Sequence, residues 1–179
     1  MTAATTATAS VALGLYNGLI DGGVDHCLYV PDSVMSSLTD RCEKDPSFAT
    51  VVCAREDEAV AIAAGFFIAN RRAVVVMEAS GIGYSGLILA RCQLQRTPVF
   101  IIASHGGLLG EAYDFHGATI AAGRGVLTGI GIPFVVLHRG DDWAEVVRLG
   151  LETVHGQRSS FAILVPPHLL VATARDVIS

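Results

Sequence analysis

The sequence lacks a long hydrophobic run and has few basic residues. Its longest apolar stretch, 59–69, contains 11 residues, whereas a membrane-spanning helix needs about 20. The 12 Lys and Arg residues are outnumbered by 17 acidic ones, which gives a net charge of -5, and no basic run offers the surface that nucleic-acid phosphates require. These absences argue against a membrane span and against a nucleic-acid partner.

The sequence also lacks the cysteine spacing of a metal site or of a disulfide framework. The four cysteines are Cys27, Cys42, Cys53 and Cys92. They include no C-x-x-C pair, and a domain of this size needs no disulfide staples. The first ten residues, MTAATTATAS, do not combine a basic segment with an apolar one, as a secretion signal would. We therefore expect reduced thiols, no metal site and a cytoplasmic protein.

Short apolar runs alternate along the chain with helical stretches. The expected strands are 26–30, 49–54, 73–77, 99–103, 134–137 and 161–165. The expected helices are 11–21, 33–43, 56–70, 84–93, 118–130 and 143–155. The strand segments are apolar throughout, which indicates burial on both faces. We predict a flexible tail over residues 1–10 and one α/β domain over residues 11–179, with a doubly wound, mainly parallel six-stranded sheet and helices on both faces.

One motif suggests a dinucleotide. Segment 81–86, GIGYSG, matches G-x-G-x-x-G. It follows the third expected strand instead of the first, and the next strand runs into Ser104 and His105 instead of the acid that would bind a ribose. The nicotinamide interpretation is therefore disfavoured. A helix entry capped by Ser80 explains the segment, and its bare backbone would also let a flat ring approach.

Three acidic residues, Glu56, Asp57 and Glu58, begin the apolar helix. Carboxylates in a first helical turn interact favourably with the helix dipole, so a structural explanation suffices for residue type alone. In open α/β sheets, however, ligands bind beyond the carboxyl ends of the strands. The cluster follows such an end, as do the loops after residues 30, 77 and 103, and these loops form the candidate site.

The segment around this cluster carries a family resemblance. REDEAVAIAAG resembles the pyrimidine-binding domain of thiamine diphosphate enzymes, such as acetolactate synthase and the 2-oxoacid decarboxylases. The sequence most resembles the α subunit of sulfopyruvate decarboxylase, together with phosphonopyruvate decarboxylase. The matching segments occur in the family's order: 30–38 (VPDSVMSSL), 55–65, 78–83 (EASGIG), 97–107 (TPVFIIASHGG) and 110–134. The resemblance covers about residues 13–165.

The resemblance implies that Glu56 bonds to a ring nitrogen of the cofactor's aminopyrimidine. A carboxyl group there favours the imino tautomer, which removes the proton from the thiazolium C2. The helix N-terminus favours the Glu56 carboxylate, whereas burial favours the neutral acid, and the sequence leaves the balance open. Asp57 and Glu58 have no such counterpart and are interpreted as dipole and surface residues.

Other candidates lie in the neighbouring loops. They are Ser80, Gly81 and Gly83 for the cofactor, Asp32 and Ser33 for the substrate, and His105 and His116 for catalysis. A histidine titrates near neutrality and can donate to an oxoacid or shuttle a proton. Asp32 and Ser33 also fit a simple turn with a helix cap. Pyruvate decarboxylases have an acidic residue at the position of Ser33, so this assignment is weaker.

The sequence lacks the GDG motif, followed by Asn, with which family members hold Mg²⁺ and the diphosphate. The resemblance therefore implies a second subunit that carries the Mg²⁺ and diphosphate site, with active sites at the interface and contacts between α subunits in a hetero-oligomer. The apolar helix 59–69 has no polar stripe, which also indicates a partner.

We expect the α subunit of a two-chain, thiamine diphosphate-dependent 2-oxoacid decarboxylase, a carboxy-lyase, acting on a substrate similar to sulfopyruvate or phosphonopyruvate. Two alternatives remain open. One is a carboligase subunit similar to acetolactate synthase, and the other is a non-catalytic scaffold subunit with the same fold.

Overall fold

The computed structural model describes residues 3–107 and 114–170, without the side chains of residues 3–10 and 115. Its centre is one six-stranded sheet in the order β2-β1-β3-β4-β6-β5, and every neighbouring pair is parallel. The strands are β1 (His26–Tyr29), β2 (Ala49–Val52), β3 (Ala73–Glu78), β4 (Phe100–Ser104), β5 (Phe134–Val136) and β6 (Phe161–Val165). The six predicted strands and the predicted fold class are confirmed.

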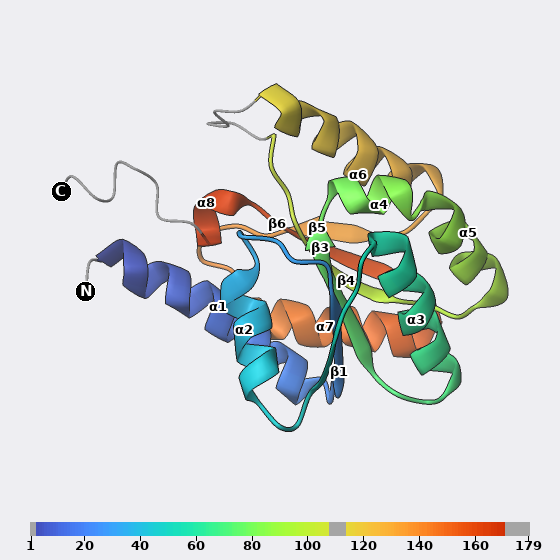
Figure 1. The fold of residues 1–179 in the computed structure, drawn as a ribbon, viewed down its shortest axis with the longest axis horizontal. Coiled ribbons are helices and arrows are strands. Elements are labelled where there is room, and N and C mark those ends of the chain that lie inside the picture. Colours follow the sequence, from blue (N-terminus) through green and yellow to red (C-terminus); the bar gives the residue numbers. More distant parts are fainter. Residues whose placement is uncertain (1–2, 108–113, 171–179) are drawn as a thin grey trace.

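Two layers of helices cover the sheet (Figure 1). One layer contains α1 (Ala3–Asp21), α2 (Ser36–Lys44), α7 (Trp143–Gln157) and α8 (Pro167–Leu170). The other contains α3 (Glu56–Ile68), α4 (Ser80–Tyr84), α5 (Gly86–Gln95) and α6 (Gly117–Gly129), with a 3₁₀ turn, η1 (Asp114–His116), before α6. Apolar side chains form a separate cluster on each face of the sheet, which explains why the strand segments show no polar alternation.

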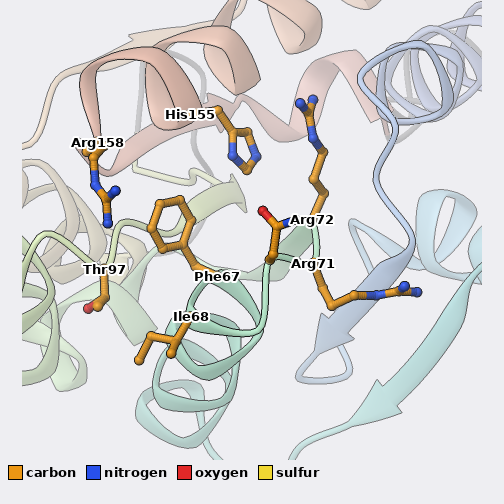
Figure 2. A pocket seen from close by; sticks show the side chains of 8 residues that line it. Phe67, Ile68, Arg71, Arg72, Thr97, His155 and Arg158 are labelled. Atoms are coloured by element: carbon orange, nitrogen blue, oxygen red, sulfur yellow. The ribbon is translucent and has the colours of Figure 1, made fainter.

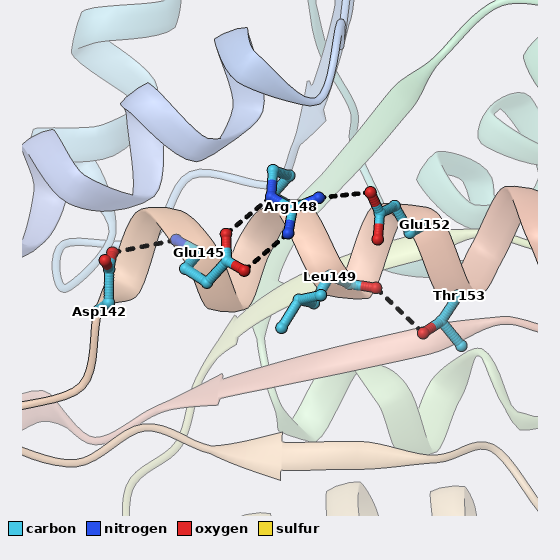
Figure 3. Close-up of polar contacts among 6 residues, drawn as sticks. All are labelled: Asp142, Glu145, Arg148, Leu149, Glu152 and Thr153. Carbon is cyan, nitrogen blue, oxygen red and sulfur yellow. Dashed lines mark hydrogen bonds and ion pairs between the residues drawn. The ribbon is translucent and has the colours of Figure 1, made fainter.

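Helix α7 illustrates how the helices are fixed (Figure 3). The Asp142 carboxylate accepts a hydrogen bond from the backbone N–H of Glu145 at 3.1 Å, which caps the helix. Arg148 pairs with Glu145 at 2.6 Å and also with Glu152 along the exposed side. The inner side packs on α1, where a Cβ on Gly18 would lie 2.6 Å from the Ala144 carbonyl oxygen. A glycine is therefore needed for this close helix contact.

Two helices begin three or more residues away from their expected starts, and one helix was not expected. Helix α1 begins at Ala3, within the expected tail, and the alanines of this segment favour a helix. Helix α2 begins at Ser36 instead of 33, because the Asp32 carboxylate accepts the Val34 N–H at 2.9 Å and forms a turn first. An additional helix, α4, precedes α5. None of the helices in the described parts of the chain is both long and apolar enough to cross a membrane.

The strand order places a topological switch point at the carboxyl edge of the sheet, between β1 and β3. From β1 the chain crosses to β2 at one edge, and after β3 it continues to β4 in the other direction. The loops after β1 and β3 therefore diverge, although these two strands are neighbours. Such a switch point is where ligands bind in open α/β sheets.

Candidate functional site

Glu56 is the first residue of α3, and its side chain lies against Gly81 of α4. An added Cβ on Gly81 would clash with Glu56 Cγ and would lie 2.7 Å from Glu56 Cδ and 2.8 Å from Glu56 Cβ. Real Cβ atoms do not approach other heavy atoms so closely. The missing side chain of Gly81 therefore gives Glu56 its place at the carboxyl edge of the sheet.

The three acidic residues of the α3 N-terminus differ in their partners. The Asp57 carboxylate accepts two hydrogen bonds from the Arg55 guanidinium, at 2.9 and 3.0 Å, and Arg55 lowers the pKa of Asp57. Glu58 accepts the Ala54 N–H at 2.9 Å. Within the described residues, the Glu56 carboxylate accepts no hydrogen bond and forms no ion pair. Of the three, only Glu56 thus has both carboxylate oxygens available for a group outside the chain.

A second carboxylate, Glu78, occupies the end of β3. It accepts hydrogen bonds from the Thr119 hydroxyl at 3.0 Å, from the Ser80 N–H at 3.1 Å and from the Ser80 hydroxyl. We expected the Ser80 side chain to cap α4, but it donates to Glu78 and does not cap the helix. Instead, the Glu78 carboxylate accepts the donors at the start of this helix.

Several groups act on the ionisation of Glu78. Burial raises its pKa from the ordinary value of 4.5, while the hydrogen bonds from Thr119 and Ser80 oppose the rise. The negative charge of Asp32 also raises the pKa of Glu78, and the charge of His116 lowers it. The loop after β1, the end of β3 and η1 therefore bring Asp32, Glu78 and His116 within electrostatic range of one another.

Asp32 is held by the turn after β1. One carboxylate oxygen accepts the Val34 N–H, and the other is buried without a hydrogen-bond partner in the described part of the chain. A buried acceptor of this kind costs free energy unless a partner satisfies it. Ser33 is exposed, and its backbone carbonyl accepts the Ser36 hydroxyl at 2.9 Å. The segment therefore forms the expected turn, but neither residue caps α2, whose N-cap is Met35. One oxygen of Asp32 remains available.

The two candidate histidines occupy different environments. His105 directly follows β4, is fully buried and donates its backbone N–H to the Val165 carbonyl at 2.9 Å. Burial, and then the charge of Arg124, lower the pKa of His105, so its ring is neutral at pH 7. His116 is partly exposed in η1, where its backbone packs against Gly107, a residue with φ +79°. Only His116 thus faces solvent beside Glu78.

The glycines of GIGYSG are used for packing. A Cβ on Gly83 would lie 2.9 Å from the Ala122 side chain, and one on Gly86 would lie 3.4 Å from Val126, both in α6. Close contacts therefore require glycine at Gly81 and Gly83, whereas the Gly86 distance is an ordinary van der Waals contact. The segment is helical and does not form a loop that could surround a pyrophosphate.

Comparison with known proteins identifies the family of this carboxyl-edge site. The model of the thiamine pyrophosphate enzymes, N-terminal TPP binding domain, matches residues 10–119. The chain belongs to this family. The matched region contains Asp32, Glu56, Glu78 and His116, and thiamine pyrophosphate is another name for thiamine diphosphate.

Relatives within the family include "Sulfopyruvate decarboxylase subunit alpha" of Methanothermobacter thermautotrophicus. It is 32% identical over 124 residues, which cover 67% of this chain and 73% of that protein. The protein of the same name from Methanocaldococcus jannaschii is 35% identical over 103 residues, which cover 56% of this chain and 60% of that one. The resemblance to this family is thereby confirmed.

Solved structures share the fold at low sequence identity. A 2-oxoglutarate:ferredoxin oxidoreductase from Magnetococcus marinus has a TM-score of 0.71 at 15% identity, covering 99% of this chain and 32% of its own. Benzoylformate decarboxylase from Polynucleobacter necessarius has a TM-score of 0.70 at 17% identity, covering 89% of this chain and 30% of its own. This chain therefore corresponds to about a third of each of these longer chains.

Sequence reasoning did not select Glu78 or Thr119. Glu78 lies inside the matched segment EASGIG, but only the serine and the glycines of that segment were chosen. One available signal was its position, because a carboxylate that ends a continuously apolar strand lies at the ligand-binding edge of a parallel sheet.

Proposed function

We propose that this chain is the α subunit of a two-chain, thiamine diphosphate-dependent 2-oxoacid decarboxylase, and that its substrate resembles sulfopyruvate or phosphonopyruvate. The observation that carries the proposal is the Glu56 carboxylate, which lies on Gly81 and has no partner within the described residues. The names of the two relatives support the assignment of subunit and substrate class.

The described residues fit the pyrimidine end of the cofactor. Glu56 offers a free carboxyl group, and the backbone of Gly81 beside it carries no side chain. When bound, thiamine diphosphate supplies the electron sink for loss of CO₂ from a 2-oxoacid. The contribution of this chain is a carboxyl group at a fixed position that can exchange a proton with a ring nitrogen.

The residues around Glu78 are proposed to receive the substrate. Burial and the negative charge of Asp32 raise the pKa of Glu78, and one oxygen of Asp32 is buried without a hydrogen-bond partner in the described part of the chain. His116 is proposed to offer its imidazole to the substrate, and a Glu78 carboxyl group that keeps its proton because of burial would add a neutral donor. His105, which is buried and neutral, is proposed to support this loop from behind.

A second subunit is proposed to bind Mg²⁺ and the diphosphate, because the sequence has no GDG motif. The surface that would receive it is the α3–α5 surface, which we define by the exposed side chains of Ile68, Leu87 and Leu94. A groove of about 510 Å³ next to Glu56, lined in part by Arg55 and Ile88, continues this surface to the candidate site. Exposed apolar side chains on neighbouring helices favour an interaction surface, and contacts between α subunits are proposed to lie there as well.

The cytoplasm is the proposed compartment. All four cysteines are free and buried in the described structure, and free thiols are the usual state in a reducing compartment.

The test uses the partner chain, recovered with this chain as bait. The complex is assayed for CO₂ release with a panel of 2-oxoacids that includes sulfopyruvate and phosphonopyruvate, and the products are identified. We expect an aldehyde and CO₂ with one of these substrates. A product in which two carbonyl compounds are joined would show a carboligase instead, and no turnover by a stable, cofactor-loaded complex would show a scaffold.

A further inference from the structure

A second cavity lies at the opposite, amino edge of the sheet. It has a volume of about 590 Å³ and is formed by the segments before β3, β4 and β6 and by the end of α7 (Figure 2). Its lining includes three arginines and one histidine but no acidic residue. This volume lies within the range of pockets that bind small molecules.

An aromatic ring and two basic groups form one wall of the cavity. The guanidinium carbon of Arg158 lies 5.3 Å from the centre of the Phe67 ring, within cation–π range. The His155 ring stacks on the same Phe67 at 5.8 Å between centres. These contacts hold Arg158 and His155 in defined positions beside the cavity.

The three guanidinium groups of the cavity differ in whether they form an ion pair. Arg71 forms an ion pair with Asp25 at 2.8 Å and points away from the cavity (Figure 2). Arg72 and Arg158 form no ion pair with any described residue. Each donates one hydrogen bond to a backbone carbonyl oxygen. Arg72 donates to that of Gly22 at 2.7 Å, and Arg158 donates to that of Arg96 at 3.4 Å. A guanidinium has five N–H donors, so most of theirs remain available.

The lining of the cavity is basic in a chain whose net charge is negative. Burial, and then the charge of Arg72, lower the pKa of His155, so its ring is neutral at pH 7. The two arginines have a structural role at the ends of helices, where cations interact favourably with carbonyl groups. That role explains one hydrogen bond of each, but it does not explain the cavity. The nearest described carboxylate, Asp25, is paired with Arg71 and does not line the cavity, in a chain of net charge -5.

The geometry points to a binding site for a small molecule that carries a phosphate group. The planar guanidinium matches phosphate oxygens with two parallel hydrogen bonds, and Arg72 and Arg158 bring two such groups to one cavity. The volume exceeds that of a phosphate alone, and Phe67 with Ile68 provides an apolar wall for the rest of the ligand. The cavity lies at the amino edge of the sheet and Glu56 lies at the carboxyl edge, so the inference is independent of the proposed decarboxylation.

The chain itself offers a matched pair of variants. Arg158 and Arg96 both end a helix in the left-handed conformation, with φ of 52° and 54°. Asn tolerates this conformation, so Arg158→Asn and Arg96→Asn remove the same charge from the same backbone geometry. Only Arg158 lines the cavity. Arg72→Gln, at an ordinary backbone position, provides a second variant if Arg158→Asn impairs folding.

The experiment is calorimetric titration of the full chain with inorganic pyrophosphate at fixed ionic strength. We expect saturable binding at one site, weakened about tenfold or more by Arg158→Asn and by Arg72→Gln, because each loses a charge-assisted hydrogen bond. Arg96→Asn should change the affinity less than about twofold. Equal weakening by Arg96→Asn and Arg158→Asn would show diffuse attraction and overturn the site, as would no saturable heat up to about 10 mM.

Discussion

The Glu56 side chain lies against the bare Cα of Gly81, so that at the meeting point of α3 and α4 it occupies the space that a residue 81 side chain would fill. The two residues follow different strands, β2 and β3, and neither position alone would place the carboxyl group. The contact fixes Glu56 at the carboxyl edge without using its oxygens, which remain available to a ligand.

Gly81→Ala should displace Glu56, because the new methyl group would occupy the position of the Glu56 side chain. We expect a loss of about 10²-fold in turnover by the reconstituted complex, the usual consequence of misplacing a reacting group by about 1 Å. Overpacking should also lower the unfolding free energy by about 1–3 kcal/mol. The control is Gly125→Ala in α6, where an added Cβ meets nothing within 4 Å. Equal turnover by the two variants would contradict the displacement.

Glu56→Gln keeps the shape of the side chain but removes its ability to exchange a proton. We expect turnover to fall by about 10²–10⁴-fold, the range for loss of a positioned acid or base, while assembly with the partner is retained. Asp57→Asn provides the comparison, since it neutralises the next residue of the same helical turn. Both variants lose a similar helix-dipole interaction, so turnover and not stability should separate them. Near-normal turnover by Glu56→Gln would refute the role.

Glu78 should make the stability of the chain depend on pH in an unusual direction. Because burial raises its pKa above 4.5, the folded chain binds this proton more tightly than the unfolded chain does. The contribution of Glu78 to stability is therefore greatest below pH 4.5 and declines as the pH rises through the raised pKa. We expect Glu78→Gln to be more stable, relative to the unmodified chain, at pH 7.5 than at pH 4. Urea unfolding at the two pH values measures the difference.

Glu145 is the control for the direction of this pH dependence, because its pKa is shifted the opposite way. The hydrogen bond from Arg148 lowers the pKa of Glu145, so its contribution is present above the ordinary value of 4.5 and is lost as the pH falls through the lowered pKa. Glu145→Gln should therefore be less stable, relative to the unmodified chain, at pH 7.5 than at pH 4. If the relative stability of both variants changes in the same direction between the two pH values, the pKa of Glu78 is not raised in the folded chain.

The α3–α5 surface can be tested with a charge. Leu94 is 85% exposed, so Leu94→Glu should change the unfolding free energy by less than about 0.5 kcal/mol. Buried in an interface, the same carboxylate would be unpaired, and we expect binding of the partner to weaken about tenfold or more. Leu149→Glu, on α7 across the sheet, is the matched variant. Co-purification and analytical ultracentrifugation compare the two, and equal binding would place the partner elsewhere.

The strands could be predicted from the sequence because each is a continuous apolar run, as in 73–77. Helix α4 could not be predicted, because SGIGY contains two glycines, which disfavour a helix. Contacts with a distant segment hold it instead: Gly83 packs on Ala122, and a Cβ on Gly123 would lie 2.9 Å from the Ala79 carbonyl oxygen. Tertiary packing outweighs local propensity at this point.

Glu56 could be selected in advance because a family resemblance names it. Glu78 could not, since its importance depends on Thr119, which is 41 residues away in the sequence, and on charges from two other loops. The amino-edge cavity had no sequence signal either, because Arg72 and Arg158 belong to different helix–strand connections. Sites assembled from distant single residues show no local pattern.

The strand order also affects how the chain can fold while it is being synthesised. Strand β5 pairs with β6, and β6 also pairs with β4. Until Phe161–Val165 leaves the ribosome, β5 has no strand to pair with, and one edge of β4 stays open. Unpaired strand edges promote aggregation. The nascent chain therefore carries its exposed edges until its last strand is inserted, and a stall before that point would leave it dependent on chaperones.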